Sequence, residues 1–130
     1  MKISTKSQYG LRAMIYLAKN KDRICSLKEI SKKEKISFDY LEKIFLKLEK
    51  AGLVRSKKGS LGGYYLAKNP KKIKIGEIIS ALEKNIFLVK CLNEICPQQN
   101  KCLAKKFWKK LNNNIQKTLN SITLANLLKK

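Results

Sequence analysis

The chain has 130 residues, of which 30 are Lys or Arg and 9 are Asp or Glu, so its net charge is +21, and it contains no histidine. The lack of histidine excludes His-based catalysis and His metal ligands, and no apolar run reaches the ~20 residues of a membrane span. The N-terminus has no apolar signal-peptide core. We therefore expect one cytoplasmic domain, with or without an assembly element, whose charge favours DNA, RNA or an anionic membrane as partner.

The first half of the chain predicts three helices. Residues 5–19 form an amphipathic first helix, and Ser26 with Glu29 matches the S-x-x-E capping box that opens a short second helix. Ser37 is placed to cap a third, longer helix. Its apolar residues at i, i+3, i+4 and i+7 form one buried stripe, namely Leu41, Ile44, Phe45 and Leu48. A short helix, a turn and a longer helix is the helix-turn-helix order.

A glycine-tipped hairpin follows the third helix. Gly52 is placed to end the helix, Leu53 and Val54 begin a strand, and the return strand begins at Tyr64. The segment 50–72 contains seven basic residues and no acidic one: Lys50, Arg55, Lys57, Lys58, Lys68, Lys71 and Lys72. Such a wing suits the phosphates of a nucleic acid. The alternative is a solvated basic face, since lysine is abundant throughout the chain.

The outward face of the third helix and the wing supply the candidate nucleic-acid contacts. N-terminal residues of a recognition helix reach base edges in the major groove. Asp39 could accept a hydrogen bond from cytosine N4 or could simply cap the helix, while Tyr40 and Lys43 could reach a base or a phosphate. RNA-type aromatic stacking motifs are missing, which favours duplex DNA. The candidate set is Ser37, Phe38, Asp39, Tyr40, Lys43, Arg55, Lys57, Lys58, Gly59 and Ser60.

The second half predicts a fourth helix from Ile75 to about Glu83, a cysteine-containing loop and a long final helix. From Ala104 the apolar residues recur at steps of 4, 3, 4, 4 and 3, close to the 3.5-residue repeat of paired helices. The candidate dimerisation residues are Trp108, Leu111, Ile115, Leu119 and Ile122. The segment after Ile122 fits either a short helix or a strand-like cap.

These elements predict a mainly α fold with a small β-wing, in which a winged helix-turn-helix domain is joined to a long dimerisation helix. The division is a DNA-binding domain at 1–84, a cysteine loop at 85–103, and the dimerisation helix with its C-terminal cap at 104–130.

Three cysteines lie close together in the polar loop, as Cys91, Cys96 and Cys102 with C-x4-C-x5-C spacing. Three thiolates favour a soft metal or a cluster, and iron–sulfur clusters are held mainly by Cys. Structural zinc usually takes four Cys or His ligands. A metal-free thiol switch is the third reading, and the spacing leaves all three open. Cys25 reads as a small buried hydrophobe. With no acid–base pair near the loop, the pattern argues against an enzyme.

The chain resembles the Rrf-two family of bacterial winged-helix regulators. The resemblance rests on KISTKSQYGLRAMIYLA, on ISFDYLEKIFLKLEKAGLVRSKKGSLGGYYLA, on IGEIISALE, on the three-Cys loop leading into LAKKFW, and on NSITLANLL. It implies a homodimeric transcription regulator that binds palindromic operators, with the third helix in the major groove and the wing at the minor groove. By position, Asp39, Tyr40 and Lys58 match residues that contact DNA.

The closing ITLANLL is most similar to the iron–sulfur-sensing branch of that family. That resemblance implies a cluster on Cys91, Cys96 and Cys102, [2Fe–2S] being favoured and [4Fe–4S] the alternative, and a repressor of cluster-assembly or related iron and redox genes. Lys105 stands where a fourth, His ligand often occurs, so the fourth ligand stays open, with Glu94 as one candidate. The competing reading is a regulator of the same fold that senses thiol oxidation or a small molecule without metal.

Overall fold

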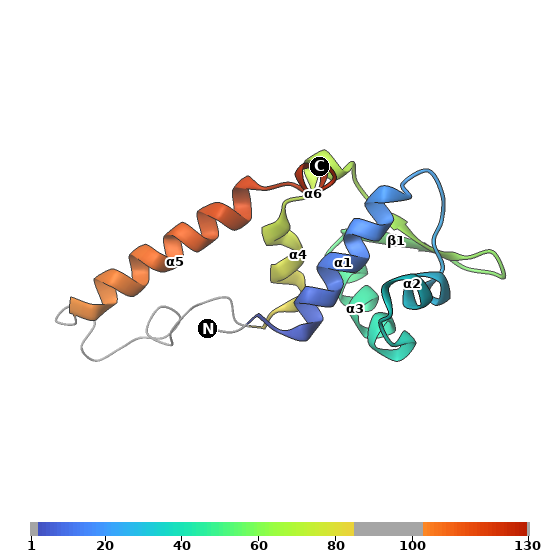
Figure 1. Ribbon diagram of the computed structural model, residues 1–130, viewed down its shortest axis with the longest axis horizontal. Helices are drawn as coiled ribbons and strands as arrows, with labels where there is room; N and C mark the ends of the chain where they lie inside the picture. Colours follow the sequence, from blue (N-terminus) through green and yellow to red (C-terminus); the bar gives the residue numbers. More distant parts are fainter. Residues whose placement is uncertain (1–2, 85–102, 130) are drawn as a thin grey trace.

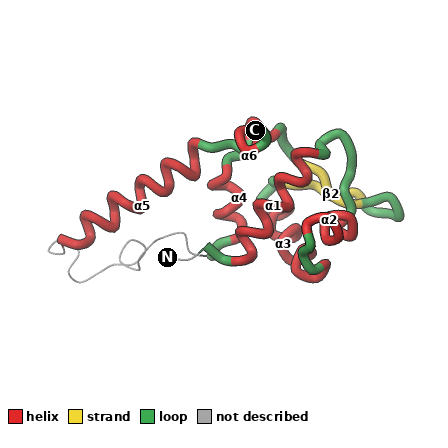
Figure 2. Tube along the Cα trace, viewed as in Figure 1, coloured by secondary structure: helices red, strands yellow, loops and turns green. Residues whose placement is uncertain are grey.

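The computed structural model describes residues 3–84 and 103–129 and shows a helical body with a two-stranded wing and one projecting helix (Figure 1; Figure 2). This arrangement confirms the predicted fold class, mainly α with a small β-wing. The elements in chain order are α1 (Thr5–Lys19), α2 (Leu27–Glu34), α3 (Phe38–Lys50), β1 (Val54–Lys57), β2 (Gly63–Leu66), the 3-10 helix η1 (Pro70–Lys72), α4 (Ile75–Leu82), α5 (Leu103–Ser121) and α6 (Leu124–Leu127).

One hydrophobic core joins α1, α3 and α4. The predicted stripe of α3 is fully buried, and it faces Met14 and Leu17 of α1 and Ile78 of α4 across the same cluster. Burying one such side chain contributes about 1.5–3 kcal/mol. Helices α1 and α4 approach so closely at Gly10 that a Cβ there would lie 2.2 Å from Leu82 Cδ1. This core is the platform on which α3 rests, so it fixes which face of α3 is exposed.

The helix-turn-helix is built from α2 and α3, each capped by a serine. Ser26 Oγ accepts from the Glu29 amide at 3.1 Å, and Ser37 Oγ accepts from the Tyr40 amide at 3.1 Å. Between them Lys35 ends α2 in the left-handed conformation, with φ +56°. The Glu29 carboxylate binds Arg23 and Tyr16 instead. Of the predicted capping box, the hydrogen bond to Ser26 therefore forms and the one to the Glu29 carboxylate does not.

The wing begins directly at the end of α3. Gly52, with φ +77°, donates to Glu49 O, and Leu53 donates to Leu48 O, both at 3.0 Å. These two bonds form the Schellman motif that stops a helix, which confirms the predicted role of Gly52. Strands β1 and β2 then pair antiparallel from Val54 opposite Leu66 to Lys57 opposite Gly63.

A third segment flanks the wing. Cys25, in the loop between α1 and α2, forms an antiparallel bridge with Tyr64 through two backbone hydrogen bonds of 3.0 and 2.8 Å. The Tyr64 ring packs on Phe45 of α3, with ring centroids 4.7 Å apart. The wing is therefore held both to α3 and to the loop that precedes α2.

The sequence left a short helix and a strand-like cap as alternatives for the segment after Ile122, and the structure contains both. Thr123 bridges Lys74 in antiparallel fashion, and the amides of Ile75 and Leu124 donate to Ile122 O and Ile73 O at 2.9 and 2.8 Å. Helix α6 follows, opened by a reciprocal capping box on Thr123. Leu124 is fully buried, so this C-terminal segment completes the core of the helical body.

Helix α5 projects from this body (Figure 1). Its last turn is anchored, because Leu119 and the following Ile122 pack against the core. Its far end is open, since Leu103 is 78% and Phe107 is 58% exposed. Phe107 lies edge-on to Trp108, with centroids 5.0 Å apart. Within the described residues, the contacts of α5 with the core thus lie at its C-terminal end.

The start of α1 is tied to the end of α4. The Glu83 carboxylate accepts from the Ser4 amide at 2.8 Å and from Ser7 Oγ at 2.6 Å. Burial by itself would raise the pKa of Glu83, but these hydrogen bonds outweigh it and the pKa is lowered. These hydrogen bonds therefore hold the end of α4, just before residue 84, against the start of α1.

Candidate nucleic-acid interface

The outward face of α3 carries acidic, basic and apolar side chains. The predicted Phe38, Asp39 and Lys43 are all exposed, Phe38 by 45%. Tyr40 is half-buried, because its ring packs edge-to-face on Tyr9 of α1 at 5.5 Å. The first turn of α3 thus presents Phe38 and Asp39 freely, while the Tyr40 ring is held against the body.

The same face continues beyond the residues predicted from the sequence. Leu46, seven residues after Asp39, is 59% exposed. It lies in a shallow surface depression of about 500 Å³ lined by Lys6, Lys43, Leu46, Lys47, Glu49 and Lys50. The spacing of Asp39, Lys43, Leu46 and Lys50 on one helical face could have identified the helix residues, whereas Lys6 comes from α1 and only the fold brings it there.

Like charges crowd this depression. The amino group of Lys6 lowers the pKa of Lys47, because the two positive charges lie close together and repel each other. Clustered lysines of this kind raise the local positive potential and so favour an anionic partner. Glu49, the acidic residue in the lining, is already engaged as acceptor from Ser56 Oγ at 2.7 Å.

The wing presents its predicted contacts to solvent. Arg55, Lys57, Lys58, Gly59 and Ser60 are all exposed. The hydrogen bond from Ser56 to Glu49 ties β1 to the last turn of α3, which also carries the basic residues Lys47 and Lys50.

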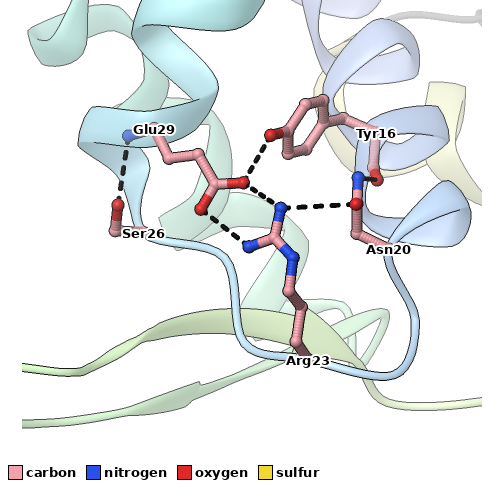
Figure 3. Close-up of polar contacts among 5 residues, drawn as sticks. All are labelled: Tyr16, Asn20, Arg23, Ser26 and Glu29. Atoms are coloured by element: carbon pink, nitrogen blue, oxygen red, sulfur yellow. Dashed lines mark hydrogen bonds and ion pairs between the residues drawn. The ribbon is translucent and has the colours of Figure 1, made fainter.

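A polar cluster beside the wing fixes the loop between α1 and α2 (Figure 3). Arg23 Nη1 donates to Glu29 Oε1 at 2.8 Å, Arg23 Nη2 also contacts Glu29, and the Tyr16 hydroxyl donates to the same carboxylate. The hydrogen bond from Arg23 lowers the pKa of Glu29 to about 2. Burial raises the pKa of Tyr16, and the hydrogen bond to Glu29 raises it further. The cluster joins α1 to α2 and so orients the helix-turn-helix.

The cysteines divide into two groups. Cys25 is fully buried in the core, and this burial raises the pKa of its thiol, which confirms the prediction of a small buried hydrophobe. Cys91, Cys96 and Cys102 lie outside the described residues, as does Glu94. Within residues 3–84 and 103–129, no three His, Cys, Asp or Glu side chains gather as a metal site.

The predicted dimerisation residues lie along α5 and just beyond its end. Trp108, Leu111 and Ile115 are half-buried on the projecting part of the helix. Leu119 and Ile122 pack against the core of their own chain, so the projecting part of the helix offers the more accessible surface. In the part of the chain that the structure describes, no helix is both long and apolar enough to cross a membrane.

Comparison with known proteins identifies relatives over the whole chain. A family model described as Rrf2, iron-dependent transcriptional regulator, matches residues 3–130. An HTH-type transcriptional regulator of Haemophilus influenzae is 42% identical over 132 residues, covering 100% of this chain and 88% of that protein.

Two solved structures share both fold and sequence. CymR, the global cysteine regulator of B. subtilis, superposes with a TM-score of 0.84 at 39% identity, covering 98% of this chain and 95% of the other. T. potens IscR gives a TM-score of 0.82 at 39% identity, covering 98% and 86%.

The winged helix-turn-helix body and these relatives define the protein as a DNA-binding transcriptional regulator and not an enzyme, as the sequence predicted. The chain belongs to the Rrf2 family. The resemblance seen in the sequence is confirmed over essentially its full length.

Proposed function

We propose that this regulator acts in the cytoplasm as a homodimer that binds a palindromic operator in duplex DNA, with α3 in the major groove and the wing against the neighbouring minor groove. The observation that carries the proposal is the set of exposed basic side chains on α3 and on the wing, two elements that a hydrogen bond from Ser56 to Glu49 ties together. Base edges are read by the first turns of a recognition helix, and basic side chains neutralise phosphates.

The side chains divide into two roles. Phe38 and Asp39, which are exposed at the start of α3, would meet base edges, Phe38 through thymine methyl groups and Asp39 through cytosine N4. Arg55, Lys57 and Lys58, which are exposed on the wing, would meet phosphates. Ser37, Tyr40, Lys43, Gly59 and Ser60 complete the proposed contact set.

Dimerisation through α5 is supported by its projection and its exposed apolar end. Trp108, Leu111 and Ile115 repeat at the spacing of paired helices, and Phe107 beside them is 58% exposed. A second copy of the chain would cover this surface. Two copies related by a twofold axis would present two copies of α3, which is what a palindromic operator requires.

DNA binding is tested by the salt dependence of operator affinity. Lys57→Ala with Lys58→Ala should weaken binding to all sequences and reduce the slope of log affinity against log salt by about two for each protomer. The matched control is Lys71→Ala with Lys72→Ala, two exposed lysines of η1 outside the proposed interface. Equal slopes for the two double variants would exclude the wing from the interface.

We propose further that Cys91, Cys96 and Cys102 hold an iron–sulfur cluster, [2Fe–2S] in preference to [4Fe–4S], that modulates operator binding. Support comes from the three-Cys spacing and from the description of the family as iron-dependent. Thiolates are the preferred protein ligands of such clusters. The regulated genes would then be those of cluster assembly or related iron and redox functions.

A metal-free thiol-sensing or small-molecule-sensing regulator is the second candidate, and a specific observation favours it. CymR, described as a cysteine regulator, matches this chain as well as IscR does, at 39% identity in each case.

One experiment separates the two candidates. The protein is purified without oxygen, and its visible absorption, iron and acid-labile sulfide are measured together with operator affinity before and after chelation. The triple variant Cys91→Ala, Cys96→Ala, Cys102→Ala is the comparison, and Cys25→Ala is the matched cysteine control. A cluster predicts matched iron and sulfide that the triple variant lacks. Colourless protein whose affinity follows thiol oxidation supports the second candidate.

A further inference from the structure

Leu61 occupies the tip of the wing and is almost entirely in solvent. It is 89% exposed, more than any other large apolar side chain in the described part of the chain. For comparison, Leu46 and Phe38, the two large apolar residues of α3 that are exposed, are 59% and 45% exposed. An isolated exposed leucine is common on protein surfaces, so its meaning depends on how the chain presents it and on what surrounds it.

The turn that carries Leu61 is tightly constrained. The Gly62 amide donates to Gly59 O at 3.0 Å, which closes a four-residue turn with Ser60 and Leu61 at its outer end. Gly59 has φ +117°, and a Cβ at Gly62 would lie 2.1 Å from Lys57 O. Glycine is therefore required on both sides of the tip. The two glycines also make the tip narrow, and Leu61 provides its large side chain.

The surroundings of Leu61 are basic, and the wing that carries it is tied to α3. Lys57 and Lys58 are exposed on the arm behind the tip, and no acidic residue occurs between Lys50 and Lys72. The arm is fixed to the last turn of α3 through Ser56 and Glu49, and the hairpin extends past the helices of the body (Figure 1). An apolar tip ahead of exposed lysines matches the order met on entering a DNA groove, with charge at the rim and base surface at the floor.

We propose that Leu61 is a wedge that enters the minor groove and partly unstacks a base step, so that the operator bends around the protein. This inference rests on the proposed DNA-binding function. The minor groove is about 6 Å wide, and it admits a tight turn more easily than a helix. Apolar side chains inserted there, leucine among them, kink the duplex by about 20–90°. Flexible pyrimidine–purine steps yield most easily, so such a step is the expected position of the wedge.

The test uses the full chain and a duplex enriched by in vitro selection with the wild-type protein. Bending is measured by energy transfer between dyes at the two ends of the duplex, at saturating protein. Unstacking is measured by 2-aminopurine fluorescence at the pyrimidine–purine step. The variants are Leu61→Ala and Leu61→Met, with Lys57→Ala plus Lys58→Ala as the matched charge control. Leu61 has little contact with the body, so thermal unfolding should be the same for all Leu61 variants.

We expect Leu61→Ala to bind about three- to tenfold more weakly, with an unchanged salt slope and with the bend and the 2-aminopurine signal lost. Leu61→Met should keep both signals, and the double lysine variant should lose salt slope but still bend the duplex when saturated. A Leu61→Ala complex that bends like wild type overturns the proposal. So does binding to vesicles of phosphatidylglycerol and phosphatidylcholine that depends on Leu61 when bending does not. If selection enriches no duplex, it is the DNA-binding function that fails, before Leu61 is tested.

Discussion

The ion pair between Arg23 and Glu29 should make the stability of the body depend on pH in a specific window. The pKa of Glu29 is lowered to about 2, chiefly by the hydrogen bond from Arg23, whereas a glutamate in an unfolded chain titrates near ~4.3. A group whose pKa is depressed in the folded state adds stability that is fully present above its unfolded pKa. That stability is lost as the pH falls from about 5 towards about 2.

The size of the effect follows from the shift and from solvent exposure. A difference of about two pKa units corresponds to roughly 3 kcal/mol for an unscreened pair. The Arg23 side chain is 49% exposed and that of Glu29 is 26% exposed, so solvent screening reduces the contribution to about 1 kcal/mol. Glu29→Gln removes the charge and keeps the shape of the side chain. It should therefore lower the free energy of unfolding by about 1 kcal/mol at neutral pH and by much less in acid.

Urea denaturation followed by circular dichroism, at intervals from about pH 7 down to about pH 3, measures this difference. Asp22→Asn is the matched control, because Asp22 is an exposed acid in the same loop as Arg23 and forms no ion pair among the described residues. The free energy difference between wild type and Glu29→Gln should shrink as the pH falls, and that between wild type and Asp22→Asn should stay near zero. Parallel pH profiles for wild type and Glu29→Gln would refute the role assigned to the ion pair.

Three further predictions, for substitutions of Gly63, Leu124 and Ser37, test the fold. Gly63→Ala would place a Cβ 2.3 Å from Cys25 O, so it should cost about 1–3 kcal/mol in urea denaturation; wild-type stability would show that the bridge between Cys25 and Tyr64 is not formed. Leu124→Ala, at a fully buried position, should cost about 2–5 kcal/mol, whereas Leu127→Ala, at 41% exposure, should stay within about 0.5 kcal/mol. Ser37→Ala removes the cap of α3 and should lower the midpoint of thermal unfolding by the equivalent of about 1 kcal/mol; an unchanged midpoint would contradict the capping role.

The elements that sequence predicted best are those with local causes. Ser37 and Gly52 begin and end α3 through hydrogen bonds to residues within a few positions, and the buried stripe follows from helical spacing alone. The C-terminal bridge between Lys74 and Thr123 joins residues far apart in the chain, so the local pattern left helix and strand equally open. At Glu29, tertiary contacts override the local capping pattern, because Arg23 and Tyr16 bind the carboxylate that a capping box would use.

In the candidate interface, the sequence predicted the exposed residues of α3 but not the contributions of α1. Phe38, Asp39 and Lys43 are exposed where the pattern placed them. Tyr40 is held by Tyr9, a contact between helices that no spacing within α3 reveals. Lys6 reaches the same surface from α1, and only the packing of α1 against α3 explains its presence there.

The connections around the wing constrain how a signal could regulate DNA binding. The wing is joined to α3 by the bonds of Leu53 to Leu48 and of Ser56 to Glu49, and it is joined to the loop before α2 by the bridge between Tyr64 and Cys25. A change in the angle between α3 and the wing would have to break several of these contacts together. Because the last turn of α5 packs against the core, a small rotation at that end of the helix would, in the proposed homodimer, move the two helix-turn-helix bodies relative to each other. We therefore expect a signal in the cysteine loop to change the spacing of the two copies of α3. That spacing must match the distance between the half-sites of a palindromic operator.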